Sequence, residues 1–370
     1  MSDTAHMAHA LALAARGLGN TWPNPAVGCV ILAGGAETGG PDRGRIVGRG
    51  FTQPGGRPHA ERLALDMAGA AARGGTAYVT LEPCAHHGKT PPCAEALIAA
   101  GVARVVTALT DPDPRVAGKG HAMLRAAGIA VTEGVMEDAA RRLNAGFLKR
   151  VTRGLPFVTL KMAATLDGRI ATASGESRWL TGSGARRAVH AMRMRHDAVM
   201  VGAGTARADD PDLTVRDIGA RHQPVRIVID SRLAHSPDSR LGRSARDVPI
   251  WMLHSPDAPA PSRAAWAATG AELIEVPAQD GRVDLRAALG ALAGRGLTRV
   301  LCEGGGQLAS ALVGAGLVDE LAVYHAGCLI GAEGAPVLGP LGIGPLADAP
   351  RPRLLDVTAL GPDALTRWAF

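Results

Sequence analysis

One histidine, one glutamate and two cysteines in a fixed order constrain this chain more than any other feature. His59-Ala60-Glu61 precedes Pro83-Cys84, and Cys93 follows after a spacer of eight residues. One imidazole and two thiolates suit a zinc ion and leave its fourth position open, whereas structural zinc sites are normally closed. A glutamate that is not a ligand can move the protons of a water held there. The pattern predicts a zinc site that removes an amino group from a ring by hydrolysis, with Glu61 as the proton carrier.

The spacer between the two cysteines distinguishes this site from related ones. Deaminases of free cytidine and of nucleic-acid bases usually close the site with Pro-Cys-x-x-Cys. Here the spacer carries His86, His87 and Lys89, held between a glycine and two prolines. Imidazole and ammonium donors suit a polar or phosphorylated arm of a substrate. We expect His86 and Lys89 to contact substrate, while His87 is equally well explained as a solvated loop residue.

Length and composition favour two domains and no membrane span. The chain has 370 residues, of which 46% are hydrophobic, enough for two buried cores. No run approaches the roughly 18 apolar residues that cross a bilayer, and Asp3 stands where a signal peptide would be cationic. Besides the two metal-site cysteines, Cys29, Cys302 and Cys328 lie in apolar runs. We expect these three to be buried and the protein to work in a reducing, cytoplasmic compartment.

The charge distribution favours a small ligand over a polynucleotide. The net charge of +6 is modest and no lysine-rich tract occurs. For stacking on bases, the first 150 residues offer only Trp22, Phe51, Tyr78 and Phe147. We expect a phosphorylated small-molecule substrate, no nucleic acid and no membrane. Two alternatives are a zinc-dependent nucleic-acid base editor, which should have basic and aromatic surfaces, and a catalytically silent sensor, which should have lost a zinc-site residue.

The hydrophobic pattern alternates helices with strands along the whole chain. In the first half we predict helices near 8–18, 59–72, 93–101, 118–127 and 137–149, and strands near 26–32, 76–81, 103–109 and 129–132. In the second half we predict helices near 185–194, 284–293 and 307–315, and strands near 156–162, 198–201, 225–230, 249–253, 272–276, 299–302 and 317–324. Glycine and proline interrupt the pattern around residue 153. We expect two α/β domains, spanning residues 1–150 and 151–370.

Two glycine-rich turns follow predicted strands in the second half. One is Gly202-Ala203-Gly204-Thr205, and the other is Gly304-Gly305-Gly306-Gln307, which opens directly onto a helix. Backbone amides at a helix start favour a phosphate group. The first turn resembles the dinucleotide fingerprint but has Arg207 in place of its third glycine. Tight turns without any ligand explain both segments equally well.

Motifs in both halves resemble a single known family. In the first half they are Pro23-Asn24-Pro25, Pro58-His59-Ala60-Glu61, the run from Thr80 to Cys93, and Asp111-Pro112-Asp113-Pro114. In the second half they are Lys161-Met162-Ala163, Leu166-Asp167-Gly168-Arg169, Ser174-Gly175-Glu176-Ser177, Asp209-Asp210-Pro211 and Glu303-Gly304-Gly305. On these residues nearly the whole chain resembles the bifunctional pyrimidine deaminase/reductase of riboflavin biosynthesis. Asp113 departs from the family pattern, which has asparagine there.

The resemblance implies two folds and two reactions. The first domain would be a cytidine-deaminase-like α/β/α unit, and the second would be an α/β unit similar to dihydrofolate reductase. The first would deaminate 2,5-diamino-6-(5-phosphoribosylamino)pyrimidin-4(3H)-one with one zinc ion per chain. The second would reduce the ribosyl arm to ribityl with NADPH, giving 5-amino-6-(5-phosphoribitylamino)uracil. We also expect a homo-oligomer, either a dimer or a tetramer.

The resemblance also assigns roles to individual residues. The zinc ligands would be His59, Cys84 and Cys93, and the substrate contacts of the deaminase would be Asn24, His86 and Lys89. The charged candidates for catalysis in the reductase are Lys161, Asp209 and Glu303. Its substrate contacts would be Ser177, Arg193, Leu213, Arg216 and Glu303. Its dinucleotide contacts would be Ala163, Trp179, Thr205, Asp209, Ser231, Gly305, Gly306 and Gln307. Without the resemblance, Lys161 is equally well explained as a strand-end lysine, and Asp210 is better explained as a turn residue.

Overall fold

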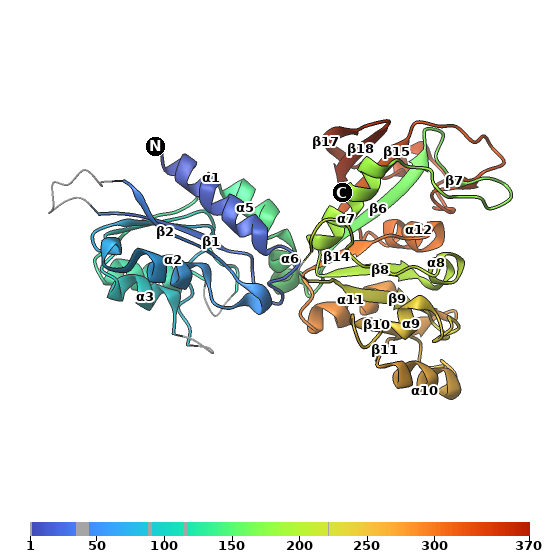
Figure 1. Ribbon diagram of the computed structural model, residues 1–370, viewed down its shortest axis with the longest axis horizontal. Coiled ribbons are helices and arrows are strands. Elements are labelled where there is room, and N and C mark those ends of the chain that lie inside the picture. Colours follow the sequence, from blue (N-terminus) through green and yellow to red (C-terminus); the bar gives the residue numbers. More distant parts are fainter. Residues whose placement is uncertain (1, 35–43, 88–90, 114–116, 221) are drawn as a thin grey trace. The chain divides into compact units, whose positions relative to one another are not determined.

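The computed structural model describes residues 2–34, 44–87, 91–113, 117–220 and 222–370. The chain divides into two compact units, Met1–Gly154 and Leu155–Phe370 (Figure 1). No helix within these described ranges has the length and hydrophobicity of a membrane span.

A five-stranded sheet forms the centre of the first unit. Its strand order is β2-β1-β3-β4-β5, with β1 antiparallel to β2 and β3, and with β3, β4 and β5 parallel. The strands are β1 (Gly28–Leu32), β2 (Ile46–Phe51), β3 (Thr76–Val79), β4 (Arg104–Thr107) and β5 (Ala130–Thr132). Every residue of β1 is buried, which explains its continuous apolar run.

The helices that pack around this sheet in the described part of the unit include two that begin beside or at predicted metal ligands. The helices are α1 (Asp3–Ala14), α2 (Ala60–Ala68), α3 (Cys93–Ala99), α4 (Lys119–Ala126), α5 (Glu137–Leu143) and α6 (Ala145–Arg153). The backbone of α2 lies directly on β2, because a Cβ atom at Gly50 would come within 2.1 Å of the Ala60 carbonyl oxygen. This close approach fixes the start of α2, where His59 and Glu61 lie.

The second unit is built on a nine-stranded sheet. Its order is β11-β10-β9-β8-β14-β6-β15-β18-β17, parallel from β11 to β15 and antiparallel at β18 and β17. The strands are β6 (Phe157–Thr165), β8 (Ala198–Gly202), β9 (Val225–Ile229), β10 (Ile250–His254), β11 (Glu272–Glu275), β14 (Arg299–Cys302), β15 (Glu320–Ala326), β17 (Arg353–Leu360) and β18 (Asp363–Ala369). Two small sheets pair β12 (Ala278–Gln279) with β13 (Arg282–Val283) and β7 (Arg169–Ala171) with β16 (Ala335–Pro336).

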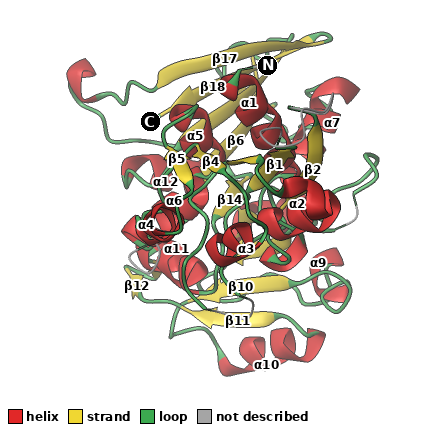
Figure 2. Ribbon diagram, turned by 90° about the vertical axis from the view of Figure 1, so that its left-hand side faces the viewer, coloured by secondary structure: helices red, strands yellow, loops and turns green. Residues whose placement is uncertain are grey.

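Helices connect the parallel strands of this second sheet. They are α7 (Ser183–Met194), α8 (Ala203–Asp209), α9 (Arg240–Arg243), α10 (Ala260–Thr269), α11 (Leu285–Gly294) and α12 (Gly306–Gly314). Both ribbon views place α10 beside β11 at one end of the sheet and β17 beside β18 at the other (Figures 1 and 2). The carboxyl ends of β6, β8, β9 and β14 meet at one edge, which is where open parallel sheets usually bind ligands.

The structure follows the predicted alternation of helices and strands, with several corrections. The predicted helix near 137–149 is two helices that meet at Asn144, where the backbone departs from helical geometry. The side chain of Asn144 bonds both backbone groups of Ala26, at 3.0 and 3.1 Å. The helix predicted from residue 59 starts one residue later and ends at Ala68, where Gly69 has a positive φ of 54°. The strands β2, β17 and β18, the short strands β7, β12, β13 and β16, and the helices α8, α9 and α10 were not predicted.

The cysteine prediction is correct at two positions and wrong at one. Cys29 and Cys302 are fully buried within strands. Cys328 is exposed, because β15 ends at Ala326 and the chain has already left the sheet. The apolar run around Cys328 therefore continues into a surface loop.

Candidate active sites

The predicted metal ligands converge at one point in the first unit. His59 is the residue just before α2, Cys93 is the first residue of α3, and Cys84 follows β3. The Nδ1 atom of His59 lies 3.3 Å from the Sγ atom of Cys93 and 3.7 Å from that of Cys84. The three ligand atoms all lie within 4.8 Å of one another, and no second group of this kind occurs among the described residues.

The chemistry of these three side chains fits zinc. Two thiolates and an imidazole form a soft donor set with room for one further ligand. The thiol of Cys93 hydrogen-bonds Cys84 and lowers the pKa of Cys84 to about 4. The Cys93 backbone N–H also donates to the Cys84 sulfur at 3.3 Å. Cys84 is therefore already favoured in the thiolate form that a metal requires.

Glu61 lies in the first turn of α2, two residues after His59. Only 4% of its surface is exposed. Burial raises the pKa of Glu61 to about 7, and the negative charge of Cys84 adds to the effect. A carboxyl group with a pKa near the working pH can both take up and release a proton during a reaction.

Of the three predicted substrate contacts of the deaminase, the structure describes two, Asn24 and His86. Asn24 is half-buried, and its backbone N–H donates to the Thr21 carbonyl oxygen at 3.0 Å. His86 is also half-buried, and its Nδ1 atom is buried without a hydrogen-bond partner among the described residues. Lys89 lies outside the described residues. The exposed His87 ring lies 3.0 Å from the Glu95 carboxylate, which accounts for this residue without a ligand.

A buried carboxylate in the motif from Thr80 to Cys93, for which the sequence predicted no role, supports the metal site. Glu82 accepts four backbone N–H groups, which belong to Asp111, Gly118, Gly120 and His121 at 2.9 to 3.3 Å. These bonds tie the segment that carries Pro83 and Cys84 to the start of α4. The one feature of the sequence that could have pointed to Glu82 is its position directly before Pro83-Cys84. The zinc motif does not require a glutamate at that position.

A single cavity of about 2030 Å³ in the second unit collects every residue that the resemblance assigned to the reductase. It lies at the carboxyl ends of β6, β8, β9 and β14. The predicted residues that line it are Lys161, Ala163, Ser177, Trp179, Arg193, Thr205, Asp209, Leu213, Arg216, Ser231, Glu303, Gly305, Gly306 and Gln307. They come from segments up to 146 residues apart in the sequence, from Lys161 to Gln307.

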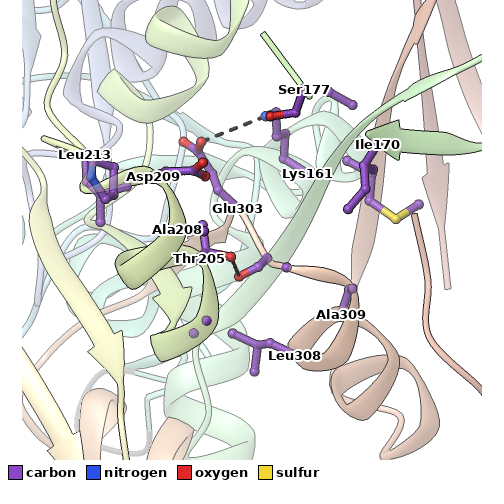
Figure 3. A pocket seen from close by; sticks show the side chains of 18 of the residues that line it. Lys161, Ile170, Ser177, Thr205, Ala208, Asp209, Leu213, Glu303, Leu308 and Ala309 are labelled. Carbon is purple, nitrogen blue, oxygen red and sulfur yellow. Dashed lines mark hydrogen bonds and ion pairs between the residues drawn. The ribbon is translucent and has the colours of Figure 1, made fainter. Parts of the chain in front are cut away.

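Glu303 is the centre of a charged cluster in this cavity. Arg193 donates to both oxygens of the Glu303 carboxylate, from Nε at 2.5 Å and from Nη2 at 2.9 Å. The ammonium group of Lys161 lies 3.9 Å from the same carboxylate, and Figure 3 shows the two side chains directed toward one another. Burial alone would raise the pKa of Glu303, but Arg193 and Lys161 outweigh it and hold the pKa at about 2. Glu303 is therefore ionised at neutral pH.

The two glycine-rich segments lie against each other, and the first, predicted as a turn, is the end of β8 and the start of helix α8. The Gly202 N–H donates to the Gly304 carbonyl oxygen at 3.1 Å. The Thr205 hydroxyl donates to the same oxygen at 3.2 Å (Figure 3). Gly305 precedes α12 with a positive φ of 50°, and a Cβ atom there would come within 2.7 Å of the Thr205 Oγ1 atom. At Gly304, by contrast, a Cβ atom would meet nothing within 4 Å, so the turn that precedes α12 is open there to a close approach, as a dinucleotide phosphate requires.

Clear structural partners exist for Asp210, Arg216 and Trp179. Asp210 ends α8 in a left-handed conformation and accepts the Arg240 N–H at 2.9 Å, as expected of a turn residue. Arg216 pairs with Asp212 at 2.8 Å. Trp179 is 73% exposed, with the Arg186 guanidinium 4.9 Å from its ring centroid.

Comparisons with known proteins agree with this geometry. Residues 1–109 match the cytidine and deoxycytidylate deaminase zinc-binding region, and residues 156–366 match the RibD C-terminal domain. The riboflavin biosynthesis protein RibD of Escherichia coli K12 is 44% identical over 98% of both chains, and that of Aquifex aeolicus is 38% identical over 98% of this chain and 96% of its own. Acinetobacter baumannii RibD has a similar solved structure, with a TM-score of 0.87 and 41% identity over 99% of this chain and 98% of its own.

A second solved structure is also similar to this chain over nearly its whole length. It is a diaminohydroxyphosphoribosylaminopyrimidine deaminase/5-amino-6-(5-phosphoribosylamino)uracil reductase from Thermotoga maritima. The TM-score is 0.84, and the sequences are 33% identical over 99% of this chain and 98% of that one.

Proposed function

This chain belongs to the RibD family of riboflavin biosynthesis proteins, and we propose which residues perform each of its two reactions. It is a bifunctional deaminase and reductase with the expected pair of α/β folds, and its cofactors are zinc and NADPH. We assign deamination of 2,5-diamino-6-(5-phosphoribosylamino)pyrimidin-4(3H)-one to Met1–Gly154. We assign reduction of the ribosyl arm to Leu155–Phe370, giving 5-amino-6-(5-phosphoribitylamino)uracil. The observation that carries this proposal is that each unit gathers the residues predicted for one of the two reactions.

In the deaminase, the proton transfers belong to Glu61. Zinc held by His59, Cys84 and Cys93 supplies a polarised water and Lewis acidity when it is bound. Glu61 takes a proton from the attacking water and passes it to the ring nitrogen, and it then carries the proton of the newly formed hydroxyl group to the departing amine. Its burial and its pKa of about 7 support this role.

The other polar groups near the zinc ligands bind the substrate. We assign this role to Asn24, His86 and Lys89. The buried, unpartnered Nδ1 atom of His86 supports its assignment, because a substrate atom would satisfy it.

In the reductase, NADPH supplies the hydride when it is bound. Lys161 is the cationic donor that faces Glu303, and we assign it the proton that the sugar arm requires. Because Glu303 is ionised, it orients Lys161 and Arg193 and accepts hydrogen bonds from the substrate. Asp209 lies at the end of α8 in the same cavity and is the third charged candidate for catalysis.

The binding residues of the cavity divide between the substrate and the dinucleotide, and some of them are also the charged residues described above. We assign substrate binding to Ser177, Arg193, Leu213, Arg216 and Glu303. We assign dinucleotide binding to Ala163, Trp179, Thr205, Asp209, Ser231, Gly305, Gly306 and Gln307. The common cavity and the open space beside Gly304, just before α12, support these assignments.

We also infer that the protein is a homo-oligomer, a dimer or a tetramer, that works in the cytoplasm. The edge strand β17 exposes Leu354, Leu355 and Val357, and apolar edge strands are normally covered. Its five cysteines are free thiols, which suits a reducing compartment.

The proposed function is tested by incubating the protein with the diaminopyrimidinone phosphate, with and without NADPH. We expect ammonia release under both conditions and the ribityl product only with NADPH. Failure to release ammonia from zinc-loaded protein would contradict the deaminase assignment. Ammonia release without any NADPH oxidation would contradict the reductase assignment alone.

A further inference from the structure

Tyr324 is a buried residue of the reductase cavity that none of the assignments above uses. It lies on β15, and only 1% of its surface is exposed. It nevertheless lines the cavity that contains Lys161 and Glu303. Its hydroxyl oxygen is buried and has no hydrogen-bond partner among the described residues.

The register of the sheet places Tyr324 on the same face as the catalytic lysine. In the parallel pair of β15 and β6, Tyr324 lies opposite Ala163, and Ala322 lies opposite Lys161. Residues two apart on a strand point to the same face, so Lys161, Ala163 and Tyr324 share one side of the sheet. The Tyr324 ring packs there with Ala185 of α7 and Leu365 of β18. The apolar part of Tyr324 is therefore held in the core, and its position is fixed.

An unpaired buried hydroxyl group is costly. Leaving such a group without a partner costs about 1 to 3 kcal/mol, and most buried polar groups in proteins are paired. A phenylalanine would fill the same space without this cost. The presence of the hydroxyl at the floor of a ligand cavity therefore points to a partner that the cavity receives.

We propose that the Tyr324 hydroxyl donates a hydrogen bond to the substrate of the reductase, at an uncharged oxygen or nitrogen of its pyrimidine or sugar. This inference rests on the proposed reductase function. Burial raises the pKa of Tyr324, and the negative charge of Glu303 adds to the effect, so the phenol stays protonated and acts as a donor. The phosphate of the substrate binds elsewhere, because the exposed guanidinium of Arg216 suits it and a phenol next to an anionic Glu303 does not.

The test is the substitution Tyr324→Phe in the full-length protein, because it removes only the hydroxyl. We expect kcat/KM for reduction of the deaminated substrate to fall about 5-fold to 100-fold. The dissociation constant of NADPH and the rate of deamination should stay within about twofold of wild type. The melting temperature should stay the same or rise, because the substitution removes an unpaired buried polar group.

The matched control is Tyr78→Phe, at the one other tyrosine of the chain. The Tyr78 hydroxyl already donates to the Asp3 carboxylate at 2.7 Å, so its loss should lower the melting temperature and leave reduction unchanged. Wild-type reduction by Tyr324→Phe would overturn the inference. A fall in melting temperature and in NADPH affinity for Tyr324→Phe would also overturn it, because the hydroxyl would then be structural. A wild-type protein that does not oxidise NADPH would instead overturn the reductase function itself.

Discussion

Arg193 holds both oxygens of the Glu303 carboxylate in a two-pronged hydrogen bond, across 110 residues of sequence. Both side chains are nearly buried, with 11% of Arg193 and 9% of Glu303 exposed. Lys161 approaches the same carboxylate, so one negative charge faces two positive ones. Loss of the carboxylate would therefore leave two nearly buried positive charges without compensation.

Glu303→Gln should leave two nearly buried cations without their counter-charge. We expect the free energy of unfolding of the second unit to fall by about 3 kcal/mol, and reduction to be lost. Denaturant unfolding followed by tryptophan fluorescence measures the change. The control is Glu275→Gln, which breaks an exposed pair with Arg263 and should cost at most about 1 kcal/mol. Equal effects of the two substitutions would contradict the central role of Glu303.

The low pKa of Glu303 also predicts a dependence of stability on acid. The folded pKa of about 2 lies below the ordinary value of 4.5, so folding favours the ionised form. This stabilisation is complete above about pH 4.5 and is lost as the pH falls toward 2. When the pH is lowered from about 5 to about 3, the free energy of unfolding of wild type should fall by more than that of Glu303→Gln. Parallel curves for the two proteins would refute the prediction.

Gly305→Val should damage cofactor binding. Gly305 precedes α12 with a positive φ, so a side chain there would strain the backbone. It would also meet the hydroxyl of Thr205, which lies in α8. We expect NADPH affinity to fall at least about tenfold, with deamination unchanged. Isothermal titration measures the affinity, and Gly290→Ala on α11, where a Cβ atom meets nothing within 4 Å, serves as the control. A folded Gly305→Val protein with wild-type NADPH affinity would exclude this turn as the phosphate site.

The zinc site could be predicted from the sequence because its chemistry is specific and its ligands follow two short motifs. The pairing of Arg193 with Glu303 could not, because tertiary packing alone brings the end of α7 beside the end of β14. Glu82 was missed because its partners are backbone N–H groups, which no side-chain pattern reveals. The strand β17 was missed because both of its faces are largely exposed, so its sequence lacks the alternation of a half-buried strand.

The domain boundary leads to a prediction about separate fragments. The helix α6 continues to Arg153, and Val151 packs against the core of the first unit. A fragment of residues 1–154 should therefore be more stable than one of residues 1–150, and it should deaminate without reducing. Residues 155–370 should reduce the deaminated substrate without releasing ammonia. Reduction by the first fragment, or deamination by the second, would contradict the division of labour.

Independence of the two sites is tested most directly by assaying Glu61→Gln for both reactions in one preparation. The substitution keeps the shape of the side chain, so the protein should retain about one zinc per chain. Deamination should fall about 100-fold to 10,000-fold, because the proton carrier is lost. Reduction of the already deaminated substrate with NADPH should proceed at the wild-type rate. A zinc-loaded Glu61→Gln protein that keeps more than about a tenth of its deamination rate, or that loses reduction as well, would contradict the account.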